Sequence, residues 1–259
     1  MLVKEIVEYL DNRFPENTAE AFDQGKIGLI IGSKNLELKN ILLSLDLTLE
    51  VAKEAVKKNC NLIIVHHPYF FTGITKVLFD TNVGRTLRIL FENNISVYAM
   101  HTNLDIAIGG VNDALASALG LTNYQVSDEL NGYVRVGNIN EMTLNDLAIH
   151  VKKSLNLGGV RVAGDLNKKI SSVAIIGGSG GQIDEIHNAM NKNAQVLITG
   201  EVKLHIAQYA VEHNFSLIEI NHGAEKWVFN LIKDELENRF NVKKTVFISE
   251  INTDPLQYR

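Results

Sequence analysis

The 259-residue chain contains little proline and cysteine, and both scarcities limit the classes of protein to which it can belong. Proline occurs only at Pro15, Pro68 and Pro255, far below the usual share of about 5%. Glycine is present in ordinary amount and heptads are missing, which excludes collagen and coiled coil. Cys60 is the only cysteine, so no intrachain disulfide forms and a reducing compartment is favoured. Its place before an apolar segment predicts a structural thiol at the start of a buried strand, with a reactive thiol as the alternative.

Long apolar runs and an excess of positive charge are also missing. No run of about 18 apolar residues occurs, and charges interrupt the N-terminal segment, which excludes a membrane span and a signal peptide and predicts a cytoplasmic protein. The net charge is −5 and the basic clusters are short pairs, so duplex nucleic acid is not expected as a partner. With 46% hydrophobic residues, the chain has enough apolar surface for a packed core, which excludes disorder.

Segments of strand and helix character alternate along most of the chain, which predicts an α/β fold with mixed sheets. Helices are expected at 3–14, 83–94, 111–120, 144–155, 183–192, 204–212 and 225–239, and after an N-cap at Thr48. Strands are expected at 27–31, 41–47, 62–65, 95–100, 173–176, 195–199, 217–220 and 245–249. The segment 122–142 is rich in Asn, Gly and charge and is expected to join the two halves.

Histidines end three of the predicted strands, and each has a second potential metal ligand nearby. The set contains four imidazoles and two carboxylates: His66 and His67, which Pro68 follows, His101 and Asp105, and His222 and Glu225. In α/β sheets, ligands bind outside the carboxyl ends of strands, and spacings of three or four bring side chains together on a helix. The count predicts a dinuclear metal site, with Asp105 as the candidate bridge. Chance polar residues at strand ends are the alternative.

The donor types narrow the choice of metal. Imidazole and carboxylate together suit Zn, Fe, Mn, Co or Ni, and the absence of thiolates argues against a closed structural zinc site. Asp46 also ends a predicted strand and is expected near the site. The remaining histidines are interpreted as surface or helix-end residues: His150, His187 and His213. The glycine-rich segment 177–181 is interpreted as a tight turn between strand and helix, with phosphate binding as the alternative.

A weak internal repeat links the two halves. In the first, His66 and His67 end one strand, a helix follows, and His101 ends the next. In the second, Gly200 and Glu201 end one strand, a helix follows, and His222 ends the next. Both arrangements place polar side chains at the carboxyl ends of strands, where ligands bind in α/β sheets.

Taken in order, these motifs resemble the GTP cyclohydrolase I type 2 homologues, also called NGG-one-interacting-factor-three-like proteins. The resemblance rests on residues 62–68, 98–105, 198–205 and 222–225. It implies two similar, intertwined α/β halves, residues 1–122 and 123–259, with a dinuclear metal site in the cleft between them. It also implies a hexameric ring of dimers, and at 259 residues the chain has no room for the large inserted domain of some members.

The resemblance further implies roles for individual residues. The two divalent metal ions would be held by His66, His67, His101, Asp105, His222 and Glu225. Glu201 and His205 match the family's Gly-acid…His stretch and would line the cleft. The family's last His and Glu are usually four positions apart, whereas His222 and Glu225 are three apart. This shorter spacing leaves the position of Glu225 open.

The family name implies hydrolysis of a nucleotide or heterocycle by metal-bound hydroxide. A metal ion lowers the pKa of bound water to about 7, and Glu201 or His205 would protonate the leaving nitrogen. The partner is then a small-molecule substrate, with nucleotides among the candidates. Two alternatives remain: a metal-dependent phosphoesterase, suggested by the glycine-rich turn, and a non-catalytic protein that binds metal or a partner.

Overall fold

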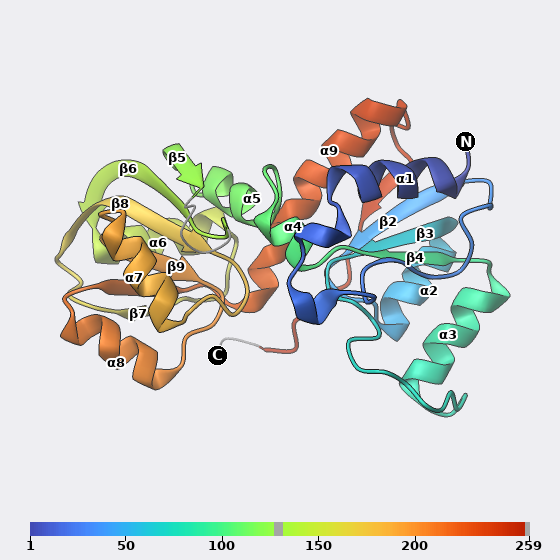
Figure 1. The fold of residues 1–259 in the computed structure, drawn as a ribbon, viewed down its shortest axis with the longest axis horizontal. Coiled ribbons are helices and arrows are strands. Elements are labelled where there is room, and N and C mark those ends of the chain that lie inside the picture. Colours follow the sequence, from blue (N-terminus) through green and yellow to red (C-terminus); the bar gives the residue numbers. More distant parts are fainter. Residues whose placement is uncertain (127–131, 257–259) are drawn as a thin grey trace. The chain divides into compact units, whose positions relative to one another are not determined.

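The computed structural model describes residues 1–126 and 132–256 and contains two compact α/β units, each built on its own mixed sheet (Figure 1). The first unit comprises Met1–Ala107 and Phe229–Pro255, and the second is formed mainly by Ile108–Val228. The predicted mixed α/β class is confirmed. Residues 229–255, which the sequence places in the second half, belong to the first unit because their strand hydrogen-bonds to the edge of the first sheet.

The first sheet has the strand order β1-β4-β3-β2-β11. β1 runs antiparallel to β4, and the other neighbours are parallel. The strands are β1 (Gly28–Ile31), β2 (Asn40–Ser44), β3 (Cys60–Val65), β4 (Ser96–Ala99) and β11 (Val246–Ile248). The helices are α1 (Val3–Arg13), α2 (Leu49–Lys57), α3 (Asn82–Glu92), α4 (Thr102–Ile106) and α9 (Val228–Phe240), with short 3-10 turns η1 (Glu16–Thr18) and η2 (Ala21–Asp23).

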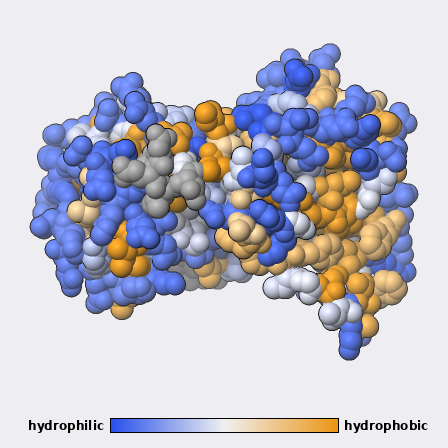
Figure 2. All heavy atoms as spheres, in the orientation of Figure 1, coloured by the Kyte–Doolittle hydropathy of each residue, from blue (hydrophilic) through white to orange (hydrophobic). Residues whose placement is uncertain are grey.

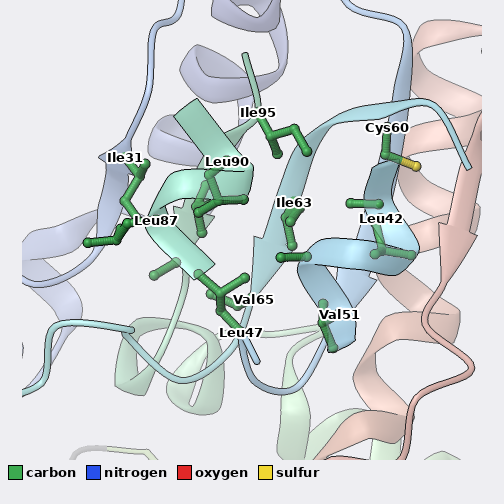
Figure 3. Packing of buried hydrophobic residues seen from close by; sticks show 14 residues of the cluster. Ile31, Leu42, Leu47, Val51, Cys60, Ile63, Val65, Leu87, Leu90 and Ile95 are labelled. Atoms are coloured by element: carbon green, nitrogen blue, oxygen red, sulfur yellow. The ribbon is translucent and has the colours of Figure 1, made fainter. Parts of the chain in front are cut away.

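One hydrophobic core of the first unit lies between the sheet and helices α2 and α3 (Figure 3). Ile63 and Val65 point into it from alternate positions of β3, as the period of a strand requires. The Thr48 side chain accepts a hydrogen bond of 3.2 Å from the Val51 N–H, which confirms the predicted N-cap of α2. Cys60 begins β3 and is buried. Burial raises the pKa of its thiol to about 12, which fits the structural role predicted for it.

The second sheet has the order β5-β6-β8-β9-β10-β7. β8, β9 and β10 are parallel, and the other pairs are antiparallel. The strands are β5 (Thr122–Val126), β6 (Arg135–Thr143), β7 (Arg161–Ala163), β8 (Lys169–Ile176), β9 (Val196–Thr199) and β10 (Ser216–Glu219). The helices are α5 (Val111–Ala118), α6 (Leu144–Ser154), α7 (Ile183–Asn191) and α8 (Leu204–Glu212), followed by the 3-10 helix η3 (His222–Trp227).

Two expectations about the elements beyond residue 121 are wrong. The segment 122–142 is not simply a connection, because β5 and most of β6 lie in it and pair with the rest of the sheet. The expected helix 225–239 is in fact two elements, since a 3-10 helix covers His222–Trp227 before α9 begins. Within the described ranges, every helix is too short or too polar to traverse a lipid bilayer.

The weak internal repeat corresponds to a repeated arrangement of strands. In the first unit, β3 and β4 are parallel neighbours, and Val65 pairs with Ala99 at their carboxyl ends. In the second unit, β9 and β10 are parallel neighbours, and Thr199 pairs with Glu219. Because the ends are level, the residues that follow them emerge at the same edge of each sheet.

A buried carboxylate ties the C-terminal segment to the first unit. Glu54 on α2 accepts hydrogen bonds from the Glu250 N–H at 3.0 Å and from the Ser249 hydroxyl, and it pairs with Lys58 at 2.9 Å. Burial alone would raise the pKa of Glu54, but these three donors outweigh it and lower the pKa. The ionised carboxylate therefore stabilises the attachment of residues 249–250 to α2.

We expect Glu54→Gln to lower the free energy of unfolding at pH 7 by roughly 2 kcal/mol, because hydrogen bonds to a charged group are lost. The folded-state pKa lies below the unfolded-state value, so the contribution is complete above about pH 4.3 and disappears as the pH falls through the folded-state pKa. Urea unfolding of both proteins at several pH values measures this. Glu50→Gln, on the same helix but exposed and paired with the exposed Lys53, should change stability by less than about 0.5 kcal/mol. Equal effects of the two substitutions would contradict the assignment.

Candidate metal centre

Three imidazole rings meet at the carboxyl edge of the first sheet. His66 and His67 directly follow β3, and their N–H groups donate to the Leu45 carbonyl at 3.2 and 3.0 Å. His101 follows β4 and precedes α4. Ring centroids lie 4.9 Å apart for His66 and His67, 5.2 Å for His66 and His101, and 5.6 Å for His67 and His101. One ligand nitrogen from each ring lies within 4.8 Å of the other two.

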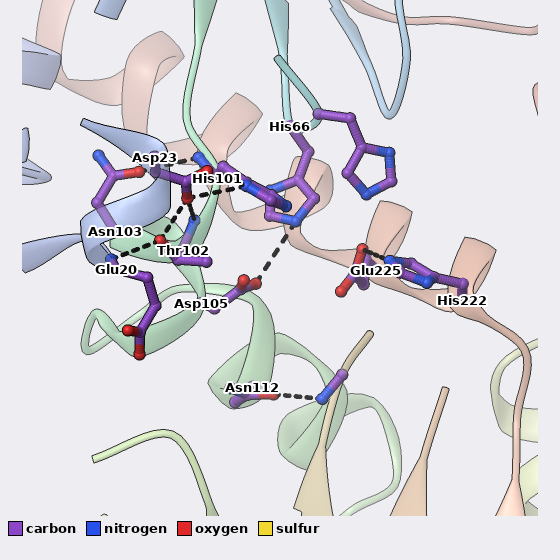
Figure 4. A network of polar contacts seen from close by, with 12 residues as sticks. Glu20, Asp23, His66, His101, Thr102, Asn103, Asp105, Asn112, His222 and Glu225 are labelled. Atoms are coloured by element: carbon purple, nitrogen blue, oxygen red, sulfur yellow. Dashed lines mark hydrogen bonds and ion pairs between the residues drawn. The ribbon is translucent and has the colours of Figure 1, made fainter. Parts of the chain in front are cut away.

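Two of these rings are held by a carboxylate at Nδ1. Asp46, just beyond β2, lies 2.7 Å from Nδ1 of His67, and Asp23, at the end of η2, lies 2.9 Å from Nδ1 of His101 (Figure 4). An ionised carboxylate only accepts hydrogen bonds, so the Nδ1 atoms carry the proton and the lone pair is on Nε2. Carboxylates of this kind commonly orient metal-binding histidines.

The two aspartates remain ionised because hydrogen bonds outweigh burial. Burial raises the pKa of Asp46, but hydrogen bonds from His67 and Thr253 lower it further than burial raises it. For Asp23, which is fully buried, burial is opposed by hydrogen bonds from His101 and Thr102, and the net pKa is again lowered. Both carboxylates therefore keep their charge and their acceptor role near neutral pH.

Asp105 supplies a carboxylate to the same cluster. It lies on α4, four residues after His101, and its N–H donates to the His101 carbonyl at 3.1 Å. Its Oδ1 atom is 3.5 Å from Nε2 of His66, which is fully buried. Two donor atoms on one tetrahedral zinc ion stand about 3.3 Å apart. The donor types and their spacing in the first unit therefore fit a divalent transition-metal ion.

In the second unit, His222 and Glu225 lie on the 3-10 helix η3. Side chains three residues apart eclipse one another in a 3-10 helix, and Nε2 of His222 lies 3.3 Å from Oε2 of Glu225 (Figure 4). The spacing of three residues between His222 and Glu225 equals one turn of a 3-10 helix. The structure therefore places the Glu225 carboxylate beside the His222 ring. Nδ1 of His222 lies 2.8 Å from Oε1 of Glu201, so this imidazole is also held by a carboxylate.

The glycine-rich turn packs against Glu225. A Cβ atom on Gly178 would lie 2.7 Å from Oε1 of Glu225, and one on Gly181 would lie 2.2 Å from the Glu201 carbonyl oxygen. Gly178 also has a φ of +57°, which favours glycine. The Gly177 N–H donates to Asn112 at 2.7 Å and fixes the turn to α5. Close packing accounts for these glycines, which supports the interpretation as a tight turn.

The other predicted site residues lie in different surroundings. Glu201 is exposed apart from its contact with His222. His205 is exposed in the first turn of α8, and within the described ranges its side chain makes no hydrogen bond or ion pair. The remaining histidines lie on helices or at a helix end, as expected: His150 on α6, His187 on α7 and His213 after α8.

Sequence reasoning missed Asp23 and only placed Asp46 near the site. Asp23 lies in a short 3-10 turn without a regular apolar pattern, 78 positions from the histidine it contacts. No local signal marks such a partner. Asp46 was found because it follows a recognisable strand, and its hydrogen bond to His67 confirms that expectation.

Comparisons with known proteins agree with the fold and the motifs. The family described as Duf34/NIF3 (NGG1p interacting factor 3) matches residues 1–255. A Clostridium acetobutylicum protein named GTP cyclohydrolase 1 type 2 homolog is 32% identical, over 99% of this chain and 98% of the relative. A solved structure of a Staphylococcus aureus hypothetical protein has a TM-score of 0.91 at 35% identity, covering 100% of this chain and 99% of that one. A Bacillus cereus protein related to NIF3 has a TM-score of 0.91 at 26% identity, with the same coverage. The chain belongs to the Duf34/NIF3 family.

Proposed function

We propose that this chain is a dinuclear metal-dependent hydrolase that acts on a nucleotide or another small heterocycle. The observation that carries the proposal is the cluster of His66, His67 and His101, whose ligand nitrogens lie within 4.8 Å of one another. Family membership and the name of the curated relatives, GTP cyclohydrolase 1 type 2 homolog, support the class of reaction. Assembly as a hexameric ring of dimers is part of the same proposal and rests on the resemblance alone.

The proposed ligands come from both units. The site would hold two divalent ions of Zn, Fe, Mn, Co or Ni. The residues proposed as their ligands are His66, His67, His101, Asp105, His222 and Glu225. The chemistry of the donor set supports this, because each unit contributes imidazole nitrogen next to carboxylate oxygen. The carboxylates on Nδ1 of His67, His101 and His222 support Nε2 as the donor atom.

When bound, such ions activate water for attack and polarise the bond that is broken. The residues of this chain orient the ligands and move protons. Asp46 and Asp23 hold their imidazoles in the Nδ1–H form. Glu201 does the same for His222 as an ionised carboxylate, so it passes a proton to a leaving nitrogen only after it has taken that proton from the attacking water; it is the first candidate for this transfer. His205 is the second candidate for that proton transfer.

The first test is metal content and turnover of the His101→Ala variant. We expect the wild-type protein, loaded with Mn²⁺, Fe²⁺ or Zn²⁺, to bind two ions per chain and to release formate from GTP. Because His101 supplies one donor of the cluster, the variant should retain its fold but bind fewer ions and lose turnover by at least about 100-fold. Elemental analysis and a formate assay measure both quantities.

The outcomes separate the alternatives. Turnover of generic phosphodiesters without turnover of GTP would favour a phosphoesterase. Tight metal binding without turnover of either substrate class would favour a non-catalytic metal-binding protein. Failure of the wild-type protein to bind any of these ions would contradict the metal centre itself.

The second test concerns the carboxylate on Nδ1. Asp46→Asn keeps the size of the side chain but removes its charge, so His67 is no longer held in one tautomer. We expect metal affinity to fall about 10- to 100-fold, as for other partners of metal-binding histidines. Competition with a chelator measures the affinity, and circular dichroism checks the fold. Asp80→Asn, an exposed aspartate of the same unit, is the matched control and should leave the affinity unchanged. Equal affinities for both variants would count against this role.

A further inference from the structure

Two half-exposed phenylalanine rings lie next to the histidine cluster of the first unit. Phe22 is 52% exposed and Phe71 is 48% exposed. Their centroids lie 6.2 Å apart with an interplanar angle of 61°, and they lie 6.3 and 6.1 Å from the ring of His101. Figure 2 shows that apolar side chains gather on part of the surface of the first unit. Keeping such rings in contact with water is unfavourable, so their position beside His101 calls for a reason.

The chain fixes both rings through neighbours that are firmly packed. Phe22 precedes Asp23 in η2, and Asp23 is anchored to Nδ1 of His101 and to the Thr102 N–H. Adjacent side chains of this turn thus diverge, since Asp23 is fully buried and Phe22 is not. Phe71 follows Tyr69 and Phe70, which pack against the core of the first unit. Both rings therefore have a defined place although they are half exposed.

A positive charge completes the arrangement. Nζ of Lys26 lies 4.4 Å from the centroid of the Phe71 ring, a cation–π contact. The Lys26 N–H donates to the Asp23 carbonyl at 2.9 Å, so the turn that presents Phe22 also positions this lysine. Phe22 and Lys26 come from the turn around Asp23, and Phe71 contacts both of them from a later segment. The three side chains thus combine aromatic surface with positive charge.

We propose that Phe22, Phe71 and Lys26 form a substrate-binding subsite beside His101. The phenylalanines receive the face of a planar heteroaromatic ring, and Lys26 pairs with a negative group on the same molecule, such as a phosphate. The inference rests on the proposed function, because it assigns the substrate class of the same site: an anionic molecule with a planar ring. These residues are binding groups, and none of them takes part in proton transfer.

This occupant fits better than a purely apolar one. Aromatic side chains stack on nucleobase-like rings, because every base presents a π-face. A buried protein–protein contact favours apolar neighbours and few lysines, whereas here the cation lies over one of the rings. Both phenylalanine rings also contact the ring of His101. A molecule bound to them would therefore lie next to a proposed metal ligand.

The test is calorimetric titration of the full-length, metal-free protein with GTP, guanosine and inorganic triphosphate. Without metal, binding is measured apart from turnover. We expect Phe71→Ala and Phe22→Ala each to weaken binding of GTP and guanosine roughly tenfold, while binding of triphosphate stays the same. Lys26→Gln should weaken GTP and triphosphate several-fold, more at low salt than at high salt, and leave guanosine unchanged. Phe71→Tyr should restore the affinity because it keeps the aromatic face.

Phe79→Ala is the matched control. Phe79 is 62% exposed in the same unit, and its ring centroid lies 5.6 Å from the guanidinium of Arg88; among the described residues it makes no ring contact with a histidine. This variant should bind all three probes like the wild type. Equal affinities in Phe22→Ala, Phe71→Ala and Phe79→Ala would overturn the subsite, as would a wild-type protein that binds triphosphate but not guanosine.

Two further results distinguish this inference from its premises. If Phe71→Ala and Phe22→Ala change the oligomer measured by light scattering while GTP affinity is retained, the rings form a protein contact and the subsite is wrong. If GTP binds as expected but the metal-loaded protein does not turn it over, the hydrolase proposal fails and the subsite stands.

Discussion

The candidate centre depends on hydrogen bonds between carboxylates and Nδ1 of histidines. Asp46 holds His67, and Glu201 holds His222. Asp46 follows β2 and His67 follows β3, and these two strands are parallel neighbours. In the same way, Glu201 follows β9 and His222 follows β10, which are also parallel neighbours. The sheet itself therefore brings the partners together, because level strand ends deliver them to the same edge. Since the carboxylates only accept hydrogen bonds, each ring is fixed in orientation and tautomer.

Backbone geometry is matched to this chemistry elsewhere in each unit. The 3-10 helix η3 aligns His222 with Glu225 despite a spacing of only three residues. Gly178 allows the backbone to approach the Glu225 carboxylate closely, where any side chain would collide with it. In the first unit, the N–H groups of His66 and His67 bind the chain just beyond β2. Short segments of irregular backbone thus complete the positioning that the strand ends begin.

The strands and the histidines at their ends were predictable from the sequence because their signals are local. β3 and β9 are fully buried and read as continuous apolar runs, and their polar ends mark the site. β5 was missed since it is largely exposed, and β6 was missed since its residues are mostly half-buried or exposed; both carry polar residues without a clear alternation. Asp23 was missed for another reason. Its role arises from a tertiary contact with His101, which is 78 positions away in the sequence. A single sequence contains no local pattern that predicts such a contact.

The measurement that tests the account most directly is anomalous diffraction at the zinc edge from crystals of the zinc-loaded protein. The account predicts zinc bound through Nε2 of His67 and His101, with Asp46 and Asp23 still hydrogen-bonded to the Nδ1 atoms. Zinc bound through Nδ1 with these carboxylates displaced, or no anomalous peak at the cluster of His66, His67 and His101, would contradict it.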